Sequence, residues 1–166
     1  MLAEEQGRSS RTDIMSGIAL VKAQRSDLEA ALDGPIDNVF AHTPEHTAFA
    51  VAVRSQADGR MRLTVEDNGP GIAADAVARG DISGRSTGLG LDIVRRVAAA
   101  SGGLLLVSNR EGGGARVDVE FGLPRLRRNC LKRLLDLGPR RPHRLVQPES
   151  DGWLLIRKRR PFGRLP

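Results

Sequence analysis

The sequence contains one cysteine, no tyrosine and few aromatic residues. The lone thiol of Cys130 excludes an internal disulfide and a cysteine-based metal cluster, and it favours a reducing compartment. The acidic segment 1–5 lacks the apolar stretch of a signal peptide, and no run approaches the roughly 20 apolar residues of a membrane-spanning helix. These absences predict a soluble, cytoplasmic protein.

The charge of the chain is unevenly distributed. At 166 residues, 40% of them apolar, the chain is long enough for one domain with a buried core. Residues 1–124 hold 13 Lys and Arg against 17 Asp and Glu, a balance of −4, whereas residues 125–166 hold 13 against 3, a balance of +10. We therefore expect a compact domain over 1–124 with no specific affinity for nucleic acid. The basic, Pro- and Arg-rich tail over 125–166 is expected to be disordered or to contact acidic surfaces.

The first third of the chain predicts strands followed by a helix. Residues 8–25 are expected to hold two short strands. Ser26 and Glu29 then have the spacing of a helix-capping box. An interior proline costs about 3 kcal/mol in a helix, so the pair Gly34-Pro35 is expected to kink the helix or make it restart.

Alternating apolar residues in the rest of the domain predict two hairpins. The first spans 49–65, and the second spans 104–121 with the glycine run 112–114 as a loose turn. A helical pattern over 89–100 lies between them. The fold class that follows is an α+β two-layer sandwich. It has a mixed, mostly antiparallel sheet of about five strands and about three helices on one face.

Two glycine-rich segments carry most of the functional information. The first, Asp67-Asn68-Gly69-Pro70-Gly71, follows a strand and places a carboxylate beside bare backbone, where a flat ring can approach. The second, Ser86-Thr87-Gly88-Leu89-Gly90-Leu91, opens a helix and offers backbone amides to a phosphate. Neither segment is a P-loop, because the required Lys is absent. Together they predict a pocket with one end for a base and the other for a polyphosphate.

A dinucleotide site is the competing interpretation of the first segment. Gly69-x-Gly71-x-x-Ala74 after a strand formally matches the dinucleotide fingerprint, which needs a helix and then a strand that carries an acid about 20 residues on. Gly80 and Gly84 break any helix at that place, and Asp92 falls inside a different helical run. The pattern therefore favours a mononucleotide pocket.

Three motifs in this order resemble those of the GHKL ATPase superfamily, specifically the catalytic ATP-binding domain of bacterial sensor histidine kinases. Asp67-x-Gly69-x-Gly71 is similar to the first glycine box of that family. Gly88-Leu89-Gly90-Leu91 is similar to the second, in its actinobacterial form. The segment Asp37-Asn38-Val39-Phe40-Ala41-His42-Thr43-Pro44-Glu45 resembles the N box. The resemblance covers roughly residues 1–122 and implies the Bergerat-type ATP-binding fold.

The resemblance also implies roles for individual residues. Asp67 would accept a hydrogen bond from the adenine amine, Asn38 would coordinate the Mg²⁺ that bridges the phosphates, and His42 would lie near the ribose or phosphate. Residues 72–87 would form a lid, with Arg79 and Arg85 as candidate phosphate contacts. The full set of residues expected to bind the nucleotide is Asn38, His42, Asp67, Gly69, Gly71, Arg85, Ser86, Thr87, Gly88, Leu89 and Gly90.

The implied function is transfer of the γ-phosphate of ATP, with Mg²⁺, to a histidine on a partner domain or chain, with a response regulator acting indirectly. The three histidines, at 42, 46 and 143, lack the sequence setting of the family's phosphoacceptor, so the acceptor is expected on a dimerisation domain of another chain. Two alternatives remain open: an anti-sigma-factor-type serine kinase, and a degenerate, non-catalytic module that binds a nucleotide or a partner.

Three residues depart from the family pattern around Asn38. Ala41 stands where the family usually has Lys or Arg, which removes a positive charge near the phosphates. Gly34 stands where many members have Asn and where the superfamily's hydrolases have a Glu base. Pro35 threatens the helical register of Asn38. These departures make nucleotide binding a safer prediction than turnover.

Overall fold

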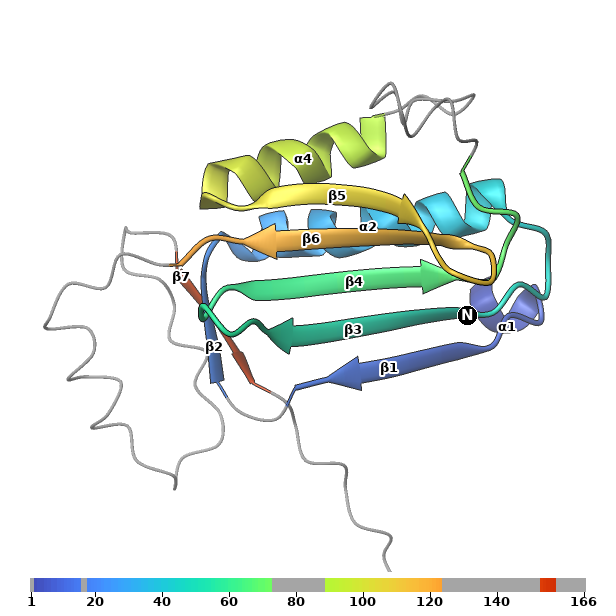
Figure 1. The fold of residues 1–166 in the computed structure, drawn as a ribbon, viewed down its shortest axis with the longest axis horizontal. Coiled ribbons are helices and arrows are strands. Elements are labelled where there is room, and N and C mark those ends of the chain that lie inside the picture. The colour runs from blue at the N-terminus through green and yellow to red at the C-terminus, as the bar shows by residue number, and fades with distance from the viewer. Residues whose placement is uncertain (1, 16–17, 73–88, 124–152, 158–166) are drawn as a thin grey trace, which may run out of the picture.

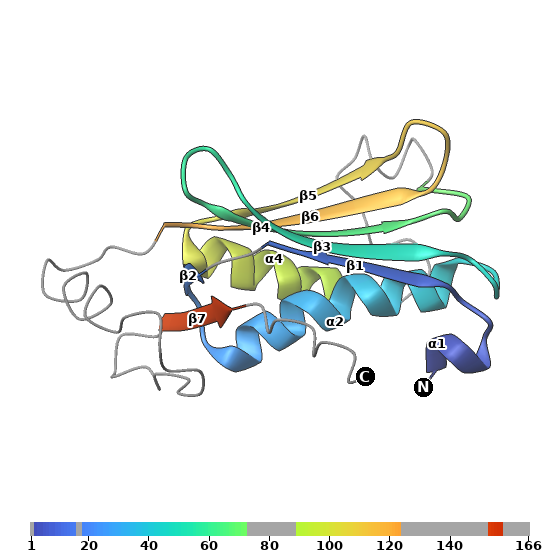
Figure 2. The same ribbon diagram turned by 90° about the horizontal axis from the view of Figure 1, so that it is seen from below.

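The protein consists of a sheet layer and a helix layer. The computed structural model describes residues 2–15, 18–72, 89–123 and 153–157. Five strands form one mixed sheet in the order β1-β3-β4-β6-β5, and the two long helices α2 and α4 cover one of its faces (Figures 1 and 2). The strands of this sheet are β1 (Ser10–Ile14), β3 (Phe49–Ser55), β4 (Met61–Asp67), β5 (Leu104–Asn109) and β6 (Ala115–Phe121). The predicted two-layer α+β fold is confirmed.

The helices among the described residues are α1 (Leu2–Glu5), α2 (Arg25–His42) and α4 (Leu89–Ser101). The helical pattern predicted for 89–100 is thus confirmed, and α4 ends before Gly102-Gly103 as such a helix should. Within the part of the chain that the structure describes, no helix is long and apolar enough to span a membrane.

The core lies between the sheet and the two helices. Both predicted hairpins are present: β3 pairs antiparallel with β4, β6 pairs antiparallel with β4 and β5, and β1 pairs parallel with β3. The register aligns Val51, Val65 and Val117 across three strands on the helix side. Burying a side chain of this size is worth about 1.5–3 kcal/mol. Among the described residues, the largest fully buried side chains are those of Phe121, Val21, Val65, Val94, Val119 and Pro35.

Helix α2 runs without interruption from Arg25 to His42, so the predicted restart at Gly34-Pro35 is wrong. Both residues are buried. A Cβ added to Gly34 would lie 2.7 Å from Val94 Cγ2 and 3.0 Å from the Gly90 oxygen, so α2 and α4 approach each other closely here. Burial against α4 offsets the cost of about 3 kcal/mol for an interior proline.

The start of α2 also differs from the expected capping box. The N-cap is Gln24, whose backbone N–H donates to Asp27 Oδ2 at 3.1 Å. Glu29 accepts instead from Arg25 Nε at 2.7 Å, and this hydrogen bond raises the pKa of the Arg25 guanidinium. The predicted pairing of Ser26 with Glu29 is therefore wrong by two residues, although the capping logic holds.

A second, two-stranded sheet lies at the end of the domain where α2 begins (Figure 1). It pairs β2 (Ile18–Lys22) with β7 (Trp153–Arg157) in antiparallel register. The two short strands expected within 8–25 are thus present as β1 and β2, but in different sheets. Strand β7 was not predicted, since the basic segment that contains it was expected to be disordered or to contact acidic surfaces. The remainder of the basic segment lies outside the described residues, so the domain boundary near 124 stays a prediction.

Candidate functional site

Three chain segments lie at one end of the sheet: the last residues of β4, the last turn of α2 and the turn between β5 and β6, on the right in Figure 1. The first turn of α4 faces this end from a position beside the middle of α2, where Gly90 lies against Gly34. The arrangement follows from chain direction: β4 and α2 both run toward this end, and α4 runs away from it. The start of a helix favours negative charge, so α4 directs a positive partial charge toward this end. Asp67 ends β4, and Asn38 lies in the second half of α2. These two residues, which are far apart in the sequence, therefore lie toward the same end of the domain.

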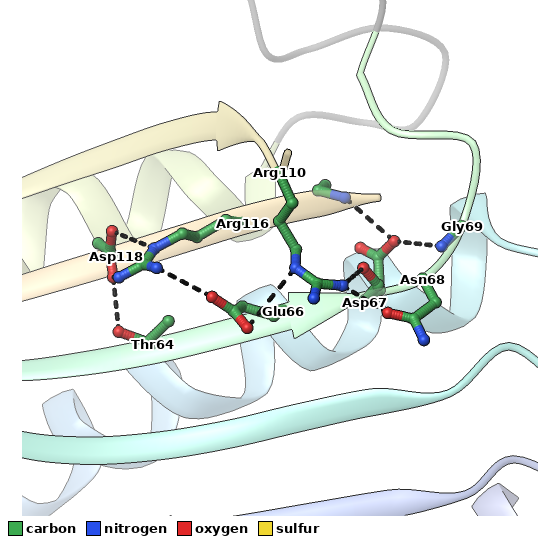
Figure 3. Close-up of polar contacts among 9 residues, drawn as sticks. Thr64, Glu66, Asp67, Asn68, Gly69, Arg110, Arg116 and Asp118 are labelled. Carbon is green, nitrogen blue, oxygen red and sulfur yellow. Dashed lines mark hydrogen bonds and ion pairs between the residues drawn. The ribbon is translucent and has the colours of Figure 1, made fainter. Parts of the chain in front are cut away.

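Asp67 is the last residue of β4 and is only 6% exposed. Its Oδ1 accepts from the backbone N–H of Gly69 at 2.8 Å and from that of Ala115 at 3.2 Å (Figure 3). Within the described part of the chain, no donor binds its Oδ2. A carboxylate held by two amides through one oxygen keeps the second oxygen as an acceptor for a ligand.

The glycine turn after Asp67 packs against the end of α2. A Cβ on Gly69 would lie 2.6 Å from Thr43 Cγ2, so only a glycine permits this contact. Thr43 is the C-cap of α2, and its hydroxyl donates to the Val39 oxygen at 2.7 Å. The turn and the helix that carries Asn38 are thus in direct contact through one threonine.

A buried arginine holds that threonine. Arg8, 6% exposed, donates to Thr43 Oγ1 at 2.6 Å and to the Thr43 oxygen at 2.9 Å. Its guanidinium carbon lies 4.9 Å from the centroid of the Phe40 ring. A cation at the C-terminus of a helix is favoured by the partial negative charge there, and the ring face adds a cation–π contribution. Arg8 therefore fixes the C-terminal end of α2.

Two further contacts hold the rest of the turn. Gly71 has φ +79°, a conformation that glycine adopts without strain. The side chain of Asn109 accepts from the Ile72 N–H at 2.7 Å and donates to the Ile72 oxygen at 2.8 Å. A Cβ on Gly114 would lie 1.9 Å from the Asp67 oxygen, so the β5–β6 turn lies directly against the strand end.

The predicted metal ligand lies in the second half of α2. Asn38 is partly buried, and its side-chain amide forms no hydrogen bond with another described residue. An uncommitted amide oxygen is a suitable ligand for Mg²⁺, which usually takes few protein ligands and keeps several waters. Asn38 therefore fits the role. His42 occupies the last position of α2 and is exposed. Among the residues that the structure describes, no three His, Cys, Asp or Glu side chains gather into a metal site.

The phosphate-loop prediction can be followed only in part. Leu89 and Gly90 form the start of α4, and Gly90 faces Gly34 of α2, with a would-be Cβ 3.7 Å from the Gly34 Cα. The predicted residues Arg79, Arg85, Ser86, Thr87 and Gly88 lie outside the described residues. Their roles stay predictions.

The face of the sheet opposite the helices carries a line of charged side chains that reaches the Asp67 turn (Figure 3). Arg116 donates to Asp118 Oδ2 at 2.8 Å and to Glu66 Oε1 at 2.9 Å. The hydrogen bond to Asp118 raises the pKa of the Arg116 guanidinium above its usual value, against the opposing effect of burial. Arg110 lies between Glu66 and the turn (Figure 3).

Several of these supporting residues were not recognised in the sequence. Gly114 belonged to a run that was interpreted as a loose turn, and Ala115 to a strand with no assigned role. Arg110 and Asn109 are more than 35 positions from Asp67 and Ile72, which they contact. Only the close pairing of β4 with β6 could have pointed to them, and that pairing is a tertiary property.

An open mixed sheet with helices on one face, and a carboxylate beside glycine turns where the helices meet its end, is the architecture of a nucleotide-binding α/β sandwich. Comparison with known proteins identifies the family. Residues 23–125 match the model described as histidine kinase-, DNA gyrase B-, and HSP90-like ATPase, and the chain belongs to this family.

Sensor kinases are among the curated relatives. Sensor protein kinase CarS of Pseudomonas aeruginosa is 38% identical over 108 residues, which cover 60% of this chain and 23% of CarS. Sensor histidine kinase component HK1 of Mycobacterium tuberculosis is 32% identical over 107 residues, which cover 59% of this chain and 62% of HK1. The chain thus spans less than a quarter of CarS and less than two thirds of HK1.

Solved structures agree on the fold. The catalytic domain of histidine kinase ThkA superposes with a TM-score of 0.63 at 21% identity, covering 72% of this chain and 81% of that domain. Full-length ShkA in complex with AMPPNP superposes with a TM-score of 0.62 at 31% identity, covering 72% of this chain and 26% of ShkA.

Proposed function

We propose that the protein is the ATP-binding catalytic unit of a two-component histidine kinase and that it transfers the γ-phosphate of ATP to a histidine on a partner domain or chain. The observation that carries this proposal is the state of Asp67. Two backbone amides hold one of its oxygens, and the other oxygen has no donor within the described part of the chain. An acceptor of this kind fits the exocyclic amine of adenine.

The remaining predicted residues fit the other parts of ATP. Asn38 supplies an uncommitted amide for Mg²⁺, and His42 at the end of α2 would contact the ribose or a phosphate. Gly90 at the start of α4, with Gly88, would present backbone amides to the phosphates. When bound, Mg²⁺ would neutralise charge on the β- and γ-phosphates.

Transfer itself requires little covalent chemistry from this chain. The bond between the γ-phosphorus and the β–γ bridging oxygen breaks, a bond to an imidazole nitrogen of the acceptor histidine forms, and ADP leaves. The protein's part is to bind and orient ATP so that these atoms are in line. The acceptor on a dimerisation domain of another chain, and a response regulator after it, belong to the proposal.

Nucleotide binding is the first test. Calorimetric titration with a non-hydrolysable ATP analogue, with and without Mg²⁺, should detect binding that depends on the metal. Asp67→Asn should weaken it at least about tenfold, because a hydrogen bond to a charged acceptor is worth about 1.5–3 kcal/mol. Asp58→Asn, at the exposed turn between β3 and β4, is the matched control and should bind as the wild type does.

The metal ligand is tested separately. Asn38→Ala should remove the Mg²⁺ dependence, while substitution of its exposed neighbour, Asp37→Ala, should leave it intact. A metal dependence that survives Asn38→Ala would show that another group binds Mg²⁺. Absence of any binding at millimolar nucleotide would exclude a kinase and leave the non-catalytic module.

A further inference from the structure

Two arginines on the outer face of the sheet share one acid but differ in what else they contact. Arg116 Nη1 donates to Glu66 Oε1 at 2.9 Å, and Arg110 Nε lies 3.6 Å from Glu66 Oε2. Their side chains are similarly exposed, 36% for Arg116 and 31% for Arg110. They are therefore close to a matched pair in charge, partner and surroundings.

Only Arg110 reaches the turn that carries the candidate base-binding carboxylate. Its Nη1 donates to the Asp67 backbone oxygen at 2.9 Å and also to Asn68 Oδ1 (Figure 3). Arg116 instead donates twice to Asp118, at 2.8 Å and 3.2 Å, well back along the sheet. On the outer face, Arg110 is thus in contact with the turn, whereas Arg116 is not.

We propose that Arg110 is a positioning residue for nucleotide recognition: it fixes the peptide between Asp67 and Asn68 from the outer face and thereby aims the Asp67 carboxylate at the base. The inference rests on the proposed function, since it concerns the same carboxylate. Arg110 itself touches neither the carboxylate nor the helix side of the sheet, where Asp67 Oδ1 is held by Gly69 and Ala115.

The backbone oxygen of Asp67 is a sensitive point at which to act. It belongs to the residue whose side chain must point at the ligand, and its neighbourhood is so tight that a Cβ on Gly114 would lie 1.9 Å from it. Arg110 also closes its own turn, because its N–H donates to the Gly114 oxygen at 2.9 Å. Arg110 therefore closes the β5–β6 turn with its backbone N–H and ties that turn to the end of β4 with its side chain.

Glu66 keeps the guanidinium of Arg110 in place. It sits one residue before Asp67 on β4 and faces outward, with its side chain 27% exposed. Arg116, Asp118 and Thr64 continue the network, the last through a hydrogen bond of 2.5 Å to Asp118 Oδ1 (Figure 3). A guanidinium held at Nε by an acid has its Nη atoms directed, which suits a positioning role.

The test compares Arg110→Gln with Arg116→Gln, which remove the same charge from the same acid. The probes are adenosine and inosine, which lack phosphates, so that long-range attraction to phosphate plays no part. Affinities are measured by NMR titration, and ADP is titrated in parallel. We expect Arg110→Gln to weaken adenosine about fivefold and to reduce the preference for adenosine over inosine by a similar factor. Arg116→Gln should change neither by more than about twofold.

Backbone amide exchange gives a readout without ligand. The Gly69 N–H, which donates to Asp67, should lose protection in Arg110→Gln and keep it in Arg116→Gln. Glu66→Gln leaves Arg110 present without its acid and should fall between the two arginine variants. Urea unfolding of each variant establishes that the comparison is made on folded protein.

The outcomes separate this inference from the proposed function. If the wild type binds adenosine and Asp67→Asn weakens it, but Arg110→Gln binds with wild-type affinity and preference, the inference is overturned and the function stands. If Arg110→Gln and Arg116→Gln lose ADP equally while keeping adenosine, Arg110 acts through charge alone and the inference is again overturned. If the wild type binds no adenine compound, the function and the inference fall together.

Discussion

The turn that carries Asp67 and the helix that carries Asn38 meet at one end of the sheet, yet they are held in different ways. Hydrogen bonds fix the turn: Arg110 holds its backbone, and Ala115 and Gly69 hold the Asp67 carboxylate. Helix α2 is fixed by shape, through the contact of Gly34 with α4, and by one buried arginine at its end. The proposed base side of the site is thus held mainly by hydrogen bonds, and the proposed metal side mainly by packing.

The difference explains the unusual residues around Asn38. Gly34 and Pro35 are buried in the contact between α2 and α4, where small size and apolar character are required. Neither of these two departures from the family pattern lies in the turn around Asp67. In that turn, loss of a polar side chain would leave a backbone amide without a hydrogen-bond partner. This contrast predicts that the turn is intolerant of added volume at one glycine and that the helix is intolerant at another, for separate reasons.

The largest effect is expected where the β5–β6 turn packs against the end of β4. In Gly114→Ala the new Cβ would meet the Asp67 oxygen at 1.9 Å in a residue with φ +90°, so overpacking and backbone strain add. We expect a loss of about 3–5 kcal/mol in the free energy of unfolding, measured with urea. Gly112→Ala is the matched control: φ is +91° but nothing lies within 4 Å, so only strain of about 1–2 kcal/mol should appear. Equal losses in both variants would show that the contact with Asp67 is unimportant.

The second effect tests the packing of α2. Replacing an interior helical glycine with alanine normally stabilises a helix by about 0.5–1 kcal/mol. Gly34→Ala should instead destabilise the protein by about 1–2 kcal/mol, because its Cβ would crowd Val94 and Gly90. Gly90→Ala, whose Cβ would lie 3.7 Å from Gly34 in ordinary contact, should be neutral or slightly stabilising. Thermal unfolding without nucleotide measures both, and a stabilising Gly34→Ala would contradict the packed interface.

The error in predicting α2 has the same origin. The restart at Gly34-Pro35 was inferred from local propensity, and tertiary packing overrides propensity when a helix face is buried. The hairpins, by contrast, were predictable because alternation is a local pattern that also encodes burial: Val117 and Val119 are buried, as their spacing requires. The local sequence pattern therefore predicted the strands of the sheet but not the contact between α2 and α4.

In the candidate site, too, some residues could be predicted from the sequence and others could not. Asp67 and its glycines could be found from the sequence, since a carboxylate and glycines in one turn are a contiguous motif. Arg110, Gly114 and Thr43 could not, because each acts on that turn across the sheet or from the end of α2. A glycine run such as 112–114 looks like a loose turn until the strand pairing places it against another backbone.

A smaller effect concerns the junction between the two regions. Thr43→Val keeps the shape but removes the hydroxyl that donates to Val39 and accepts from the buried Arg8. We expect a loss of about 1–2 kcal/mol in unfolding free energy, because a buried guanidinium N–H loses its acceptor. Thr47→Val is the matched control, since its hydroxyl makes one exposed hydrogen bond to Pro44, and it should cost less than about 0.5 kcal/mol. Equal costs would mean that Arg8 does not depend on Thr43.

The smallest effect addresses the missing charge on the metal side. Ala41 is exposed near the end of α2, at the position where the family usually has Lys or Arg. Ala41→Arg should tighten ATP about two- to threefold, the size expected for one exposed charge near a phosphate, and leave adenosine unchanged. Ala41→Gln, which adds length without charge, should change neither ligand. Calorimetry with ATP and NMR titration with adenosine make the comparison. A gain for adenosine as well would place the effect on the base side, against the division of the site, because a charge on α2 should be felt only where the phosphates lie.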